Sequence, residues 1–362
     1  MVLPPSGLLI RYFIPMKYDA GKHRTHLFRR KRRGPLLPIG LIIAAALLGI
    51  FFSLIPTDFL RNSLPINVSI PTFTPIPILP TITRTPRPVN AHGGTIVFTC
   101  TRGDTNHICG INADGTDFRQ ITNAERNDYY PAFDPLSQNV VFAANYQGGF
   151  DLFAVDLNSG NVSQLTYNIG NVFSPSFSPD GQQIVFVNRV GGGPYSLWIS
   201  GRNGEYPHSI YTGTNTIVAV SWSPSGDRIA FAMAVDQQNS YEIFLLNVDD
   251  LRQPPQRITK GLPGIDGSLV WSPDAKNLLF CAGPDKLKNI YRADINNEVP
   301  IQLTNGGFNN AAAAYSLDGQ FIVFNSLRNN NNANLYIMRS DGTDEHQLTN
   351  DTEPDWQPEW GP

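Results

Sequence analysis

The sequence predicts an all-β fold: a six-bladed β-propeller of four-stranded blades, preceded by a single transmembrane helix and a Pro/Thr-rich linker. Three observations predict it: a repeat of about 45 residues from residue 93 onward, an uncharged run over residues 36–55, and abundant turn formers. The 362 residues include 31 Gly and 29 Pro but only 16% charged residues, which argues against a helical bundle. With 21 Phe, 13 Tyr and 5 Trp the chain can fill a sizeable core.

The first 92 residues divide into a basic cytoplasmic tail (1–35), a transmembrane signal-anchor helix (36–56) and a Pro/Thr-rich stalk (57–92). At about 1.5 Å per residue, the uncharged run spans roughly the 30 Å core of a bilayer. Eight Lys or Arg residues lie in the 20 positions before this run, and only Arg61 lies in the 20 after it. The positive-inside rule then places the N-terminus in the cytoplasm and the rest of the chain outside it.

Two alternatives to the signal anchor are less favoured. A cleaved signal peptide would have an unusually long basic region, and no A-x-A site follows the apolar run. A buried core helix is disfavoured by the basic cluster at 29–33. We therefore expect contact with membrane lipid through 36–56, whether the chain starts at Met1 or at Met16.

The stalk and the body of the chain differ in composition. Prolines interleaved with threonines through 57–92 exclude a helix and favour an extended conformation. After residue 33 the chain carries 18 basic and 29 acidic residues. Such an acidic body is not expected to bind nucleic acid, because phosphate contacts need clustered Lys and Arg.

Two landmarks define the repeat. An aromatic residue near a proline recurs every 41 to 49 residues, at Phe133, Phe177, Trp222, Trp271, Tyr315 and Trp356. A Gln-Leu-Thr-like tripeptide closes each unit, at 120–122, 164–166, 209–211, 257–259, 302–304 and 347–349. Between these landmarks lie two alternating apolar runs, which predict strands.

Each unit supplies four strands in about 45 residues, which is the size of a propeller blade. Six such units fill residues 93–362. A four-stranded sheet cannot bury both of its faces alone, so the units must stack around an axis. The first unit lacks its aromatic-proline strand and the last is followed by a surplus one, so we expect the C-terminal strand 351–358 to complete blade 1.

The repeat motifs resemble those of the TolB-like propeller family. The segments that carry the resemblance are SPDG at 178–181, SWSPSG at 221–226, WSPD at 271–274 and SDGT at 340–343. The resemblance implies the propeller fold but says little about function, because this repeat serves many unrelated roles. Here a membrane segment and a stalk precede the propeller where TolB has an α/β domain, so a Tol-Pal role is not implied.

Signals for catalysis are poor. The sequence contains no nucleophile elbow, H-E-x-x-H, P-loop or C-x-x-C motif. The propeller region holds only His107, His208 and His346, in three different repeats and without metal-ligand spacing. We therefore expect a protein that is not an enzyme and carries no cofactor.

Cys100 and Cys109 flank a short loop between two predicted strands of blade 1. Outside the cytoplasm a disulfide could join them. Because disulfide geometry is restrictive, two unpaired cysteines are the favoured alternative. Cys281 has no evident partner.

A set of polar residues is expected where the innermost strands begin, at one mouth of the central channel. Counting back from each aromatic landmark gives the carboxylates Asp128, Asp266 and Asp351, with Asn127, Asn171 and Asn310 at or beside the same positions. These carboxylates are weak candidates for a metal site, with Ca²⁺ as the ion, and the asparagines are candidates for a binding face. The favoured alternative is that they cap turns into the strands.

We therefore expect a membrane-anchored propeller, periplasmic or at the cell surface, that acts as a non-catalytic binding or scaffold module. Its partner would be a protein, a peptide or an envelope polymer, with a protein or peptide docking at the channel mouth. Variable loops at 191–194, 236–240 and 329–334 lie on that face, where recognition is usually built. Two alternatives remain: a hydrolase or lyase that uses the channel mouth, and the sensor end of a signalling complex.

Overall fold

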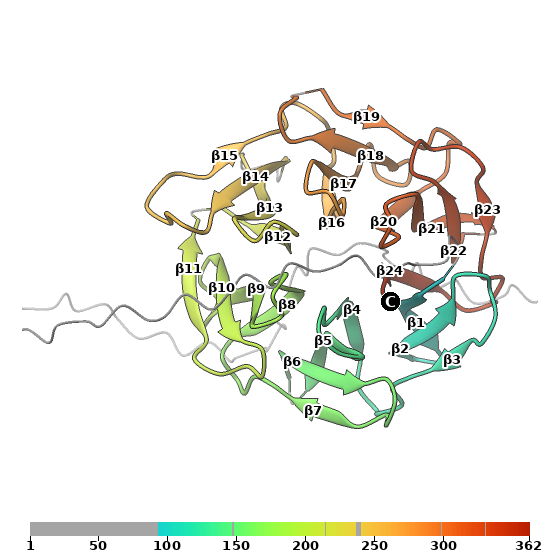
Figure 1. Ribbon diagram of the computed structural model, residues 1–362, viewed down its shortest axis with the longest axis horizontal. Helices are drawn as coiled ribbons and strands as arrows, with labels where there is room; N and C mark the ends of the chain where they lie inside the picture. Colours follow the sequence, from blue (N-terminus) through green and yellow to red (C-terminus); the bar gives the residue numbers. More distant parts are fainter. Residues whose placement is uncertain (1–92, 147, 214, 237–239, 298, 330) are drawn as a thin grey trace, which may run out of the picture. The chain divides into compact units, whose positions relative to one another are not determined.

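The computed structural model describes residues 93–362, apart from residues 147, 214, 237–239, 298 and 330. In this part of the chain six antiparallel four-stranded sheets stand around a common axis (Figure 1). The predicted all-β six-bladed propeller is therefore confirmed. The predicted tail (1–35), transmembrane helix (36–56) and stalk (57–92) lie outside the described residues, within which no helix is long and apolar enough to cross a bilayer.

In each blade the strands follow one another from the axis to the rim. Blade 1 consists of β24 (Asp355–Trp360), β1 (Thr95–Arg102), β2 (Thr105–Asn112) and β3 (Arg119–Gln120). Blade 2 consists of β4 (Asp128–Phe133), β5 (Asn139–Tyr146), β6 (Gly149–Asp156) and β7 (Val162–Gln164). Blade 3 consists of β8 (Asn171–Phe177), β9 (Gln183–Arg189), β10 (Tyr195–Gly201) and β11 (His208–Thr212).

The second half of the ring repeats this order. Blade 4 consists of β12 (Ile217–Trp222), β13 (Arg228–Ala234), β14 (Tyr241–Asn247) and β15 (Gln256–Arg257). Blade 5 consists of β16 (Asp266–Trp271), β17 (Asn277–Ala282), β18 (Asn289–Asp294) and β19 (Ile301–Gln302). Blade 6 consists of β20 (Asn310–Tyr315), β21 (Phe321–Asn329), β22 (Asn332–Arg339) and β23 (His346–Gln347).

The core lies between the blades. The second strand of each blade buries one phenylalanine at 0 or 1% exposure: Phe98, Phe142, Phe186, Phe231, Phe280 and Phe324. The part of the chain that the structure describes contains six apolar clusters, and each is built from two neighbouring blades. Because a blade buries its apolar faces only against its neighbours, the ring must close to leave neither face exposed.

The Gln-Leu-Thr landmark has a structural role in this packing. The hydroxyl of the buried Thr304 accepts a hydrogen bond from the backbone N–H of Ile290 at 3.0 Å, and Thr349 does the same for Leu335 at 3.0 Å. The glutamine of the motif donates from its amide to the threonine carbonyl, as Gln302 does at 2.7 Å. The motif therefore satisfies backbone groups where the short outer strand ends.

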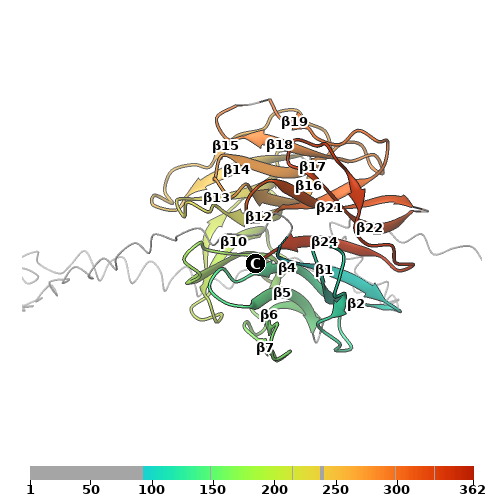
Figure 2. The ribbon, with the colours of Figure 1, turned by 45° about the vertical axis from the view of Figure 1, so that its right-hand side comes forward.

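The ring closes through β24, which pairs with β1 (Figure 2). This strand begins at Asp355, whereas the aromatic landmark predicted residues 351–358. Its closing aromatic is Trp360, not Trp356, because Trp360 ends β24 as Phe133 ends β4. Counting from the closing threonine would have avoided this error: β24 begins six residues after Thr349, as β20 begins six after Thr304.

Two faces of the ring follow from this topology. The top face is where the innermost strands begin, and it carries the loops between blades and the turns between second and third strands. The bottom face carries the turns between first and second strands and between third and fourth strands. The predicted channel-mouth residues belong to the top face.

Candidate functional site

The top face places two of the three predicted carboxylates at strand starts, in separate blades. Asp128 and Asp266 are the first residues of β4 and β16. Asp351 lies in the loop before β24, and Asp355 occupies the position predicted for it. These residues are not assembled into one site.

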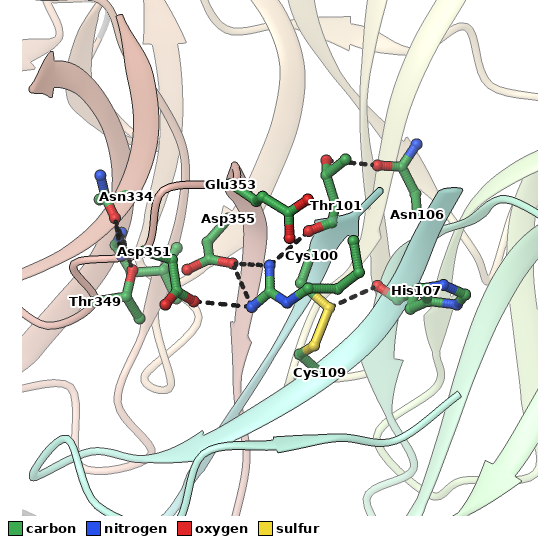
Figure 3. Close-up of polar contacts among 12 residues, drawn as sticks. Cys100, Thr101, Asn106, His107, Cys109, Asn334, Thr349, Asp351, Glu353 and Asp355 are labelled. Carbon is green, nitrogen blue, oxygen red and sulfur yellow. Dashed lines mark hydrogen bonds and ion pairs between the residues drawn. A yellow bond between two sulfur atoms is a disulfide. The ribbon is translucent and has the colours of Figure 1, made fainter. Parts of the chain in front are cut away.

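Each of these carboxylates contacts a basic side chain, and two of them share one arginine. Arg126 bonds Asp128 through Nε at 2.9 Å, and Lys288 pairs with Asp266. Arg102 reaches both Asp351 at 2.8 Å and Asp355 at 3.4 Å, and Figure 3 labels these two aspartates. Among the described residues no group of three or more His, Cys, Asp or Glu side chains could hold a metal ion. The carboxylates therefore serve to fix the loops that lead into the innermost strands.

Burial explains the pKa values of two of these groups. Asp128 and Asp355 are fully buried, and the lost hydration raises the pKa of Asp128 and raises that of Asp355 to about 7. The hydroxyl of a closing threonine and the nearby arginine oppose the shift in both cases. Each of these carboxyls therefore interacts with the hydroxyl of the threonine that closes the preceding unit of the repeat.

The predicted asparagines have different environments. Asn127 accepts hydrogen bonds from the backbone and side-chain nitrogens of Asn106, both at 3.0 Å. Asn310 is fully buried, donates to Thr304 at 3.1 Å and accepts from Arg328 at 3.2 Å. Asn171 is exposed at the start of β8. Of the three, Asn171 is the one whose side chain is open to a partner.

The structure joins Cys100 of β1 to Cys109 of β2 by a disulfide, while Cys281 is buried and free (Figure 3). In the register of this hairpin Cys100 lies opposite His107, and Cys109 lies opposite Phe98. The cysteines are thus a diagonal pair with Cα atoms 5.8 Å apart, which lies inside the range that a disulfide spans. The favoured interpretation, two unpaired cysteines, was therefore wrong, because it did not consider cysteines placed diagonally across the hairpin.

An aromatic group that the sequence did not single out lies on the top face of blades 2 and 3. It consists of Tyr129, Tyr130, Phe173 and Tyr195. The ring centroids of Tyr129 and Tyr130 are 6.3 Å apart, Tyr130 and Phe173 are also 6.3 Å apart, and Phe173 meets Tyr195 edge-on at 5.6 Å. All four side chains are half-buried, so each keeps accessible surface.

Arg189 extends this group. Its guanidinium lies 5.1 Å from the ring centroid of Tyr195 and donates to the carbonyls of Gly193 and Gly192 at 3.0 and 3.2 Å. Within the described residues no carboxylate forms an ion pair with it. The guanidinium is therefore positioned by its own turn and keeps donors for another molecule.

The tyrosines on this face act as hydrogen-bonding groups rather than bases. Burial raises the pKa of Tyr130 to about 12, and the Asp266 carboxylate raises it further. Burial likewise raises the pKa of Tyr241 to about 12, and among the described residues its hydroxyl has no hydrogen-bond partner. Both phenols stay protonated at neutral pH.

The three histidines do not converge. His107 is buried, and the lost hydration lowers its pKa. Its Nε2 contacts the Thr105 hydroxyl at 2.9 Å. His208 and His346 lie on the rim strands of blades 3 and 6, where each contacts a backbone carbonyl two residues before it.

Comparison with known proteins places this ring in a family. The model of the TolB beta propeller domain matches residues 80–193 and 191–362. The chain belongs to the TolB β-propeller family. The resemblance carried by the sequence motifs is thereby confirmed, over the same residues that form the six blades.

Three relatives of this TolB-family chain illustrate the similarity. An uncharacterized protein of Agrobacterium fabrum is 33% identical over 158 residues, or 43% of this chain and 52% of that protein, so the chain spans about half the length of this curated relative. TolB from Acinetobacter baumannii aligns with a TM-score of 0.67 at 19% identity over 75% of this chain and 68% of that one. Putative TolB from Agrobacterium tumefaciens aligns with a TM-score of 0.57 at 16% identity over 75% and 99%. These two structures show the shared fold.

Family membership does not predict the aromatic group. The repeat motifs define the strands of each blade, but not the side chains at the top-face ends of those strands. One sequence signal was present: two tyrosines begin YYPAF at 129–133 where the other innermost strands carry different residues. The two tyrosines form one group with Phe173 and Tyr195 only because neighbouring TolB-type blades pack side by side.

Proposed function

We propose that this chain is a non-catalytic binding module whose top face, over blades 2 and 3, takes a protein or peptide partner. Residues 36–56 would hold it to a membrane with the propeller outside the cytoplasm, as the charge asymmetry of the sequence favours. The observation that carries the proposal is the aromatic group with Arg189 stacked beside it.

The composition of this surface matches that of protein-binding surfaces. Tyrosine and arginine are enriched among the residues that dominate binding energy, because they combine large apolar area with directed hydrogen bonds. Val190, next to Arg189 in the chain, adds apolar surface on this face and is 49% exposed. A partner with an apolar segment and a carboxylate would cover these side chains and pair with Arg189.

The absence of a converging catalytic set supports the non-catalytic half of the proposal. Within the described residues the three histidines stand in different blades, and each top-face carboxylate of the predicted set is held in an ion pair with Arg102, Arg126 or Lys288. The tyrosines stay protonated at neutral pH because burial raises their pKa values. Such groups orient a ligand and do not exchange protons with it.

The test is cross-linking in intact cells followed by purification of the full-length chain in detergent. The variants are Arg189→Glu and the pair Arg189→Ala with Tyr195→Ala. The matched control is Arg252→Ala with Tyr206→Ala, which removes the same residue types from the bottom face, where these side chains are 94% and 87% exposed. A fragment of residues 1–92, cross-linked and purified in the same way, shows which proteins are recovered without the propeller.

A partner recovered with the wild type and the control, but lost with both top-face variants, is the expected result. Melting of the purified variants checks that they fold. Equal recovery with all variants, or nothing beyond the 1–92 background, would overturn the proposal. An enzymatic activity that depends on the top face would overturn its non-catalytic half.

A further inference from the structure

A cleft of about 460 Å³ lies on the bottom face between blades 5 and 6, away from the proposed docking surface. The turn between β16 and β17, the turn between β20 and β21, and the inner side of β18 form its walls. It is lined by Ser272, Pro273, Asp274, Asn277, Arg292, Tyr315, Asp318, Gly319 and Ser340. The volume falls in the lower part of the range of roughly 300–1,000 Å³ that is typical of small-molecule sites.

Arg292 departs from the repeat. It lies two residues after Ile290, whose N–H binds the closing threonine of the blade. The residues at the same place in the other third strands are small or apolar: Gly110, Ala154, Ile199, Leu245 and Ile337. In blades 3, 4 and 6 that residue is at most 5% exposed and packs in the apolar cluster against the next blade. Blade 5 therefore places a guanidinium where a blade elsewhere places an apolar side chain.

Tyr315 is a second departure in the same cleft. The closing aromatics of the other innermost strands are Phe or Trp: Phe133, Phe177, Trp222, Trp271 and Trp360. Tyr315 alone among these six adds a hydroxyl. Burial raises its pKa to about 12, so the phenol stays protonated and can donate. Two independent substitutions in the repeat thus make one inter-blade space polar.

The charges in the cleft do not neutralise one another. Arg292 donates to the carbonyl of Ser340 at 3.2 Å and, within the described residues, forms no ion pair. Asp274 accepts through Oδ1 from the hydroxyl of Ser272 at 2.6 Å, and Asp318 accepts in the same way from that of Ser316 at 2.6 Å. These turn contacts hold both carboxylates in place. The second oxygen of Asp318 is left as an acceptor, while that of Asp274 lies 4.0 Å from the ammonium group of Lys276, a side chain that is 72% exposed.

We infer that this cleft binds a small ligand that carries both a carboxylate and an ammonium group, namely a short peptide with free ends or an amino acid. The carboxylate pairs with Arg292, and the ammonium group lies against Asp274 and Asp318. A purely anionic ligand would meet two carboxylates, and a purely cationic one would meet the guanidinium. The site is separate from the top face, so its failure and that of the proposed function are distinguishable.

The test is calorimetric titration of the full-length chain in detergent with four probes: alanine, Ala-Ala, acetyl-Ala-Ala and Ala-Ala amide. We expect Ala-Ala or alanine to bind at one site per chain. The probe that binds more tightly shows whether the ligand is a short peptide or a free amino acid. The acetylated and amidated peptides each lack one charge and should bind about tenfold more weakly or worse. No heat from either free-ended probe at millimolar concentration, or equal affinity for all four, would overturn the inference.

Two variants separate binding from folding. Arg292→Ile restores the residue type of blades 3 and 6, so it should keep or raise the melting temperature while abolishing binding. Arg252→Gln is the matched control, an arginine that is 94% exposed on the same face, and it should bind as the wild type does. Binding that survives Arg292→Ile would overturn the inference.

Discussion

Glu359 provides a test of how the C-terminal strand is held in the ring. It lies in β24 opposite Val97 of β1, and among the described residues no hydrogen bond or ion pair to it is found. The corresponding residues of the other innermost strands are uncharged: Ala132, Ser176, Ser221, Val270 and Ala314. Lost hydration raises the pKa of Glu359 from 4.5 to about 8. The folded state therefore prefers the protonated side chain.

The consequence for stability follows from proton linkage. Below pH 4.5 the carboxyl is neutral in both the folded and the unfolded state. Between pH 4.5 and about 8 it ionises in the unfolded state only, so the free energy of unfolding falls as pH rises. Each pKa unit corresponds to about 1.4 kcal/mol, which sets an upper limit of about 5 kcal/mol on the loss.

The perturbation is Glu359→Gln, which removes the charge and keeps the shape. We expect the variant to match the wild type near pH 4.5 and to exceed it by a few kcal/mol, at most about 5, above pH 8. The assay is urea unfolding of the full-length chain, followed by tryptophan fluorescence across this pH range. Taking the difference between the two chains removes contributions from other groups, including Asp355.

The control is Glu125→Gln, which changes an exposed glutamate in the loop before β4. It should leave the free energy of unfolding within about 0.5 kcal/mol at every pH. A difference for Glu359→Gln that does not change with pH, or a variant less stable than the wild type above pH 8, would contradict this prediction. The first result would mean that folding leaves the pKa of this carboxyl unchanged, and the second would mean that a favourable contact holds the ionised carboxylate.

Two further predictions concern blade 1. Replacing Arg102 with Met should lower the free energy of unfolding by about 2–3 kcal/mol above pH 7, because it leaves the buried Asp355 carboxylate without its cation. The loss should shrink at lower pH, where Asp355 takes up a proton. Urea melts at two pH values measure this, and an equal loss at both would contradict it. Replacing Cys100 and Cys109 with Ala should cost about 2–3 kcal/mol through loop closure. A thiol count on the denatured, unreduced wild type should find one free group, Cys281, and three would contradict the bridge.

Much of the fold was predictable because it is encoded locally. Alternating apolar runs, turn residues and the recurring threonine specify each blade within about 45 residues. The error at the C-terminus has the same origin, since Trp356 and Trp360 both lie close to Pro358 and either fits the landmark. The spacing from Thr349 distinguishes them, because each innermost strand begins five to seven residues after the closing residue of the preceding unit, and a strand aligned on Trp356 would begin only two residues after it.

The candidate sites were less predictable. Counting found Asp128 and Asp266 at strand starts but gave Asp351 in place of Asp355. It did not find their cations, since Arg102 lies 249 residues from Asp351 and Lys288 lies 22 from Asp266. Without those cations the sequence suggests an acidic ring, whereas the structure shows separate ion pairs. The tyrosines of the aromatic group were visible in the sequence only as strand residues.

The ring of six blades could be read from the sequence, because strand periodicity and turn chemistry act over a few residues. The contacts between side chains of different blades could be read only from the folded chain, which places Phe173 against Tyr130, β24 beside β1, and Arg292 in a cleft with Asp318. The repeat predicts which blades are neighbours. It does not predict which side chains touch, because that depends on how the apolar faces of the blades pack against each other.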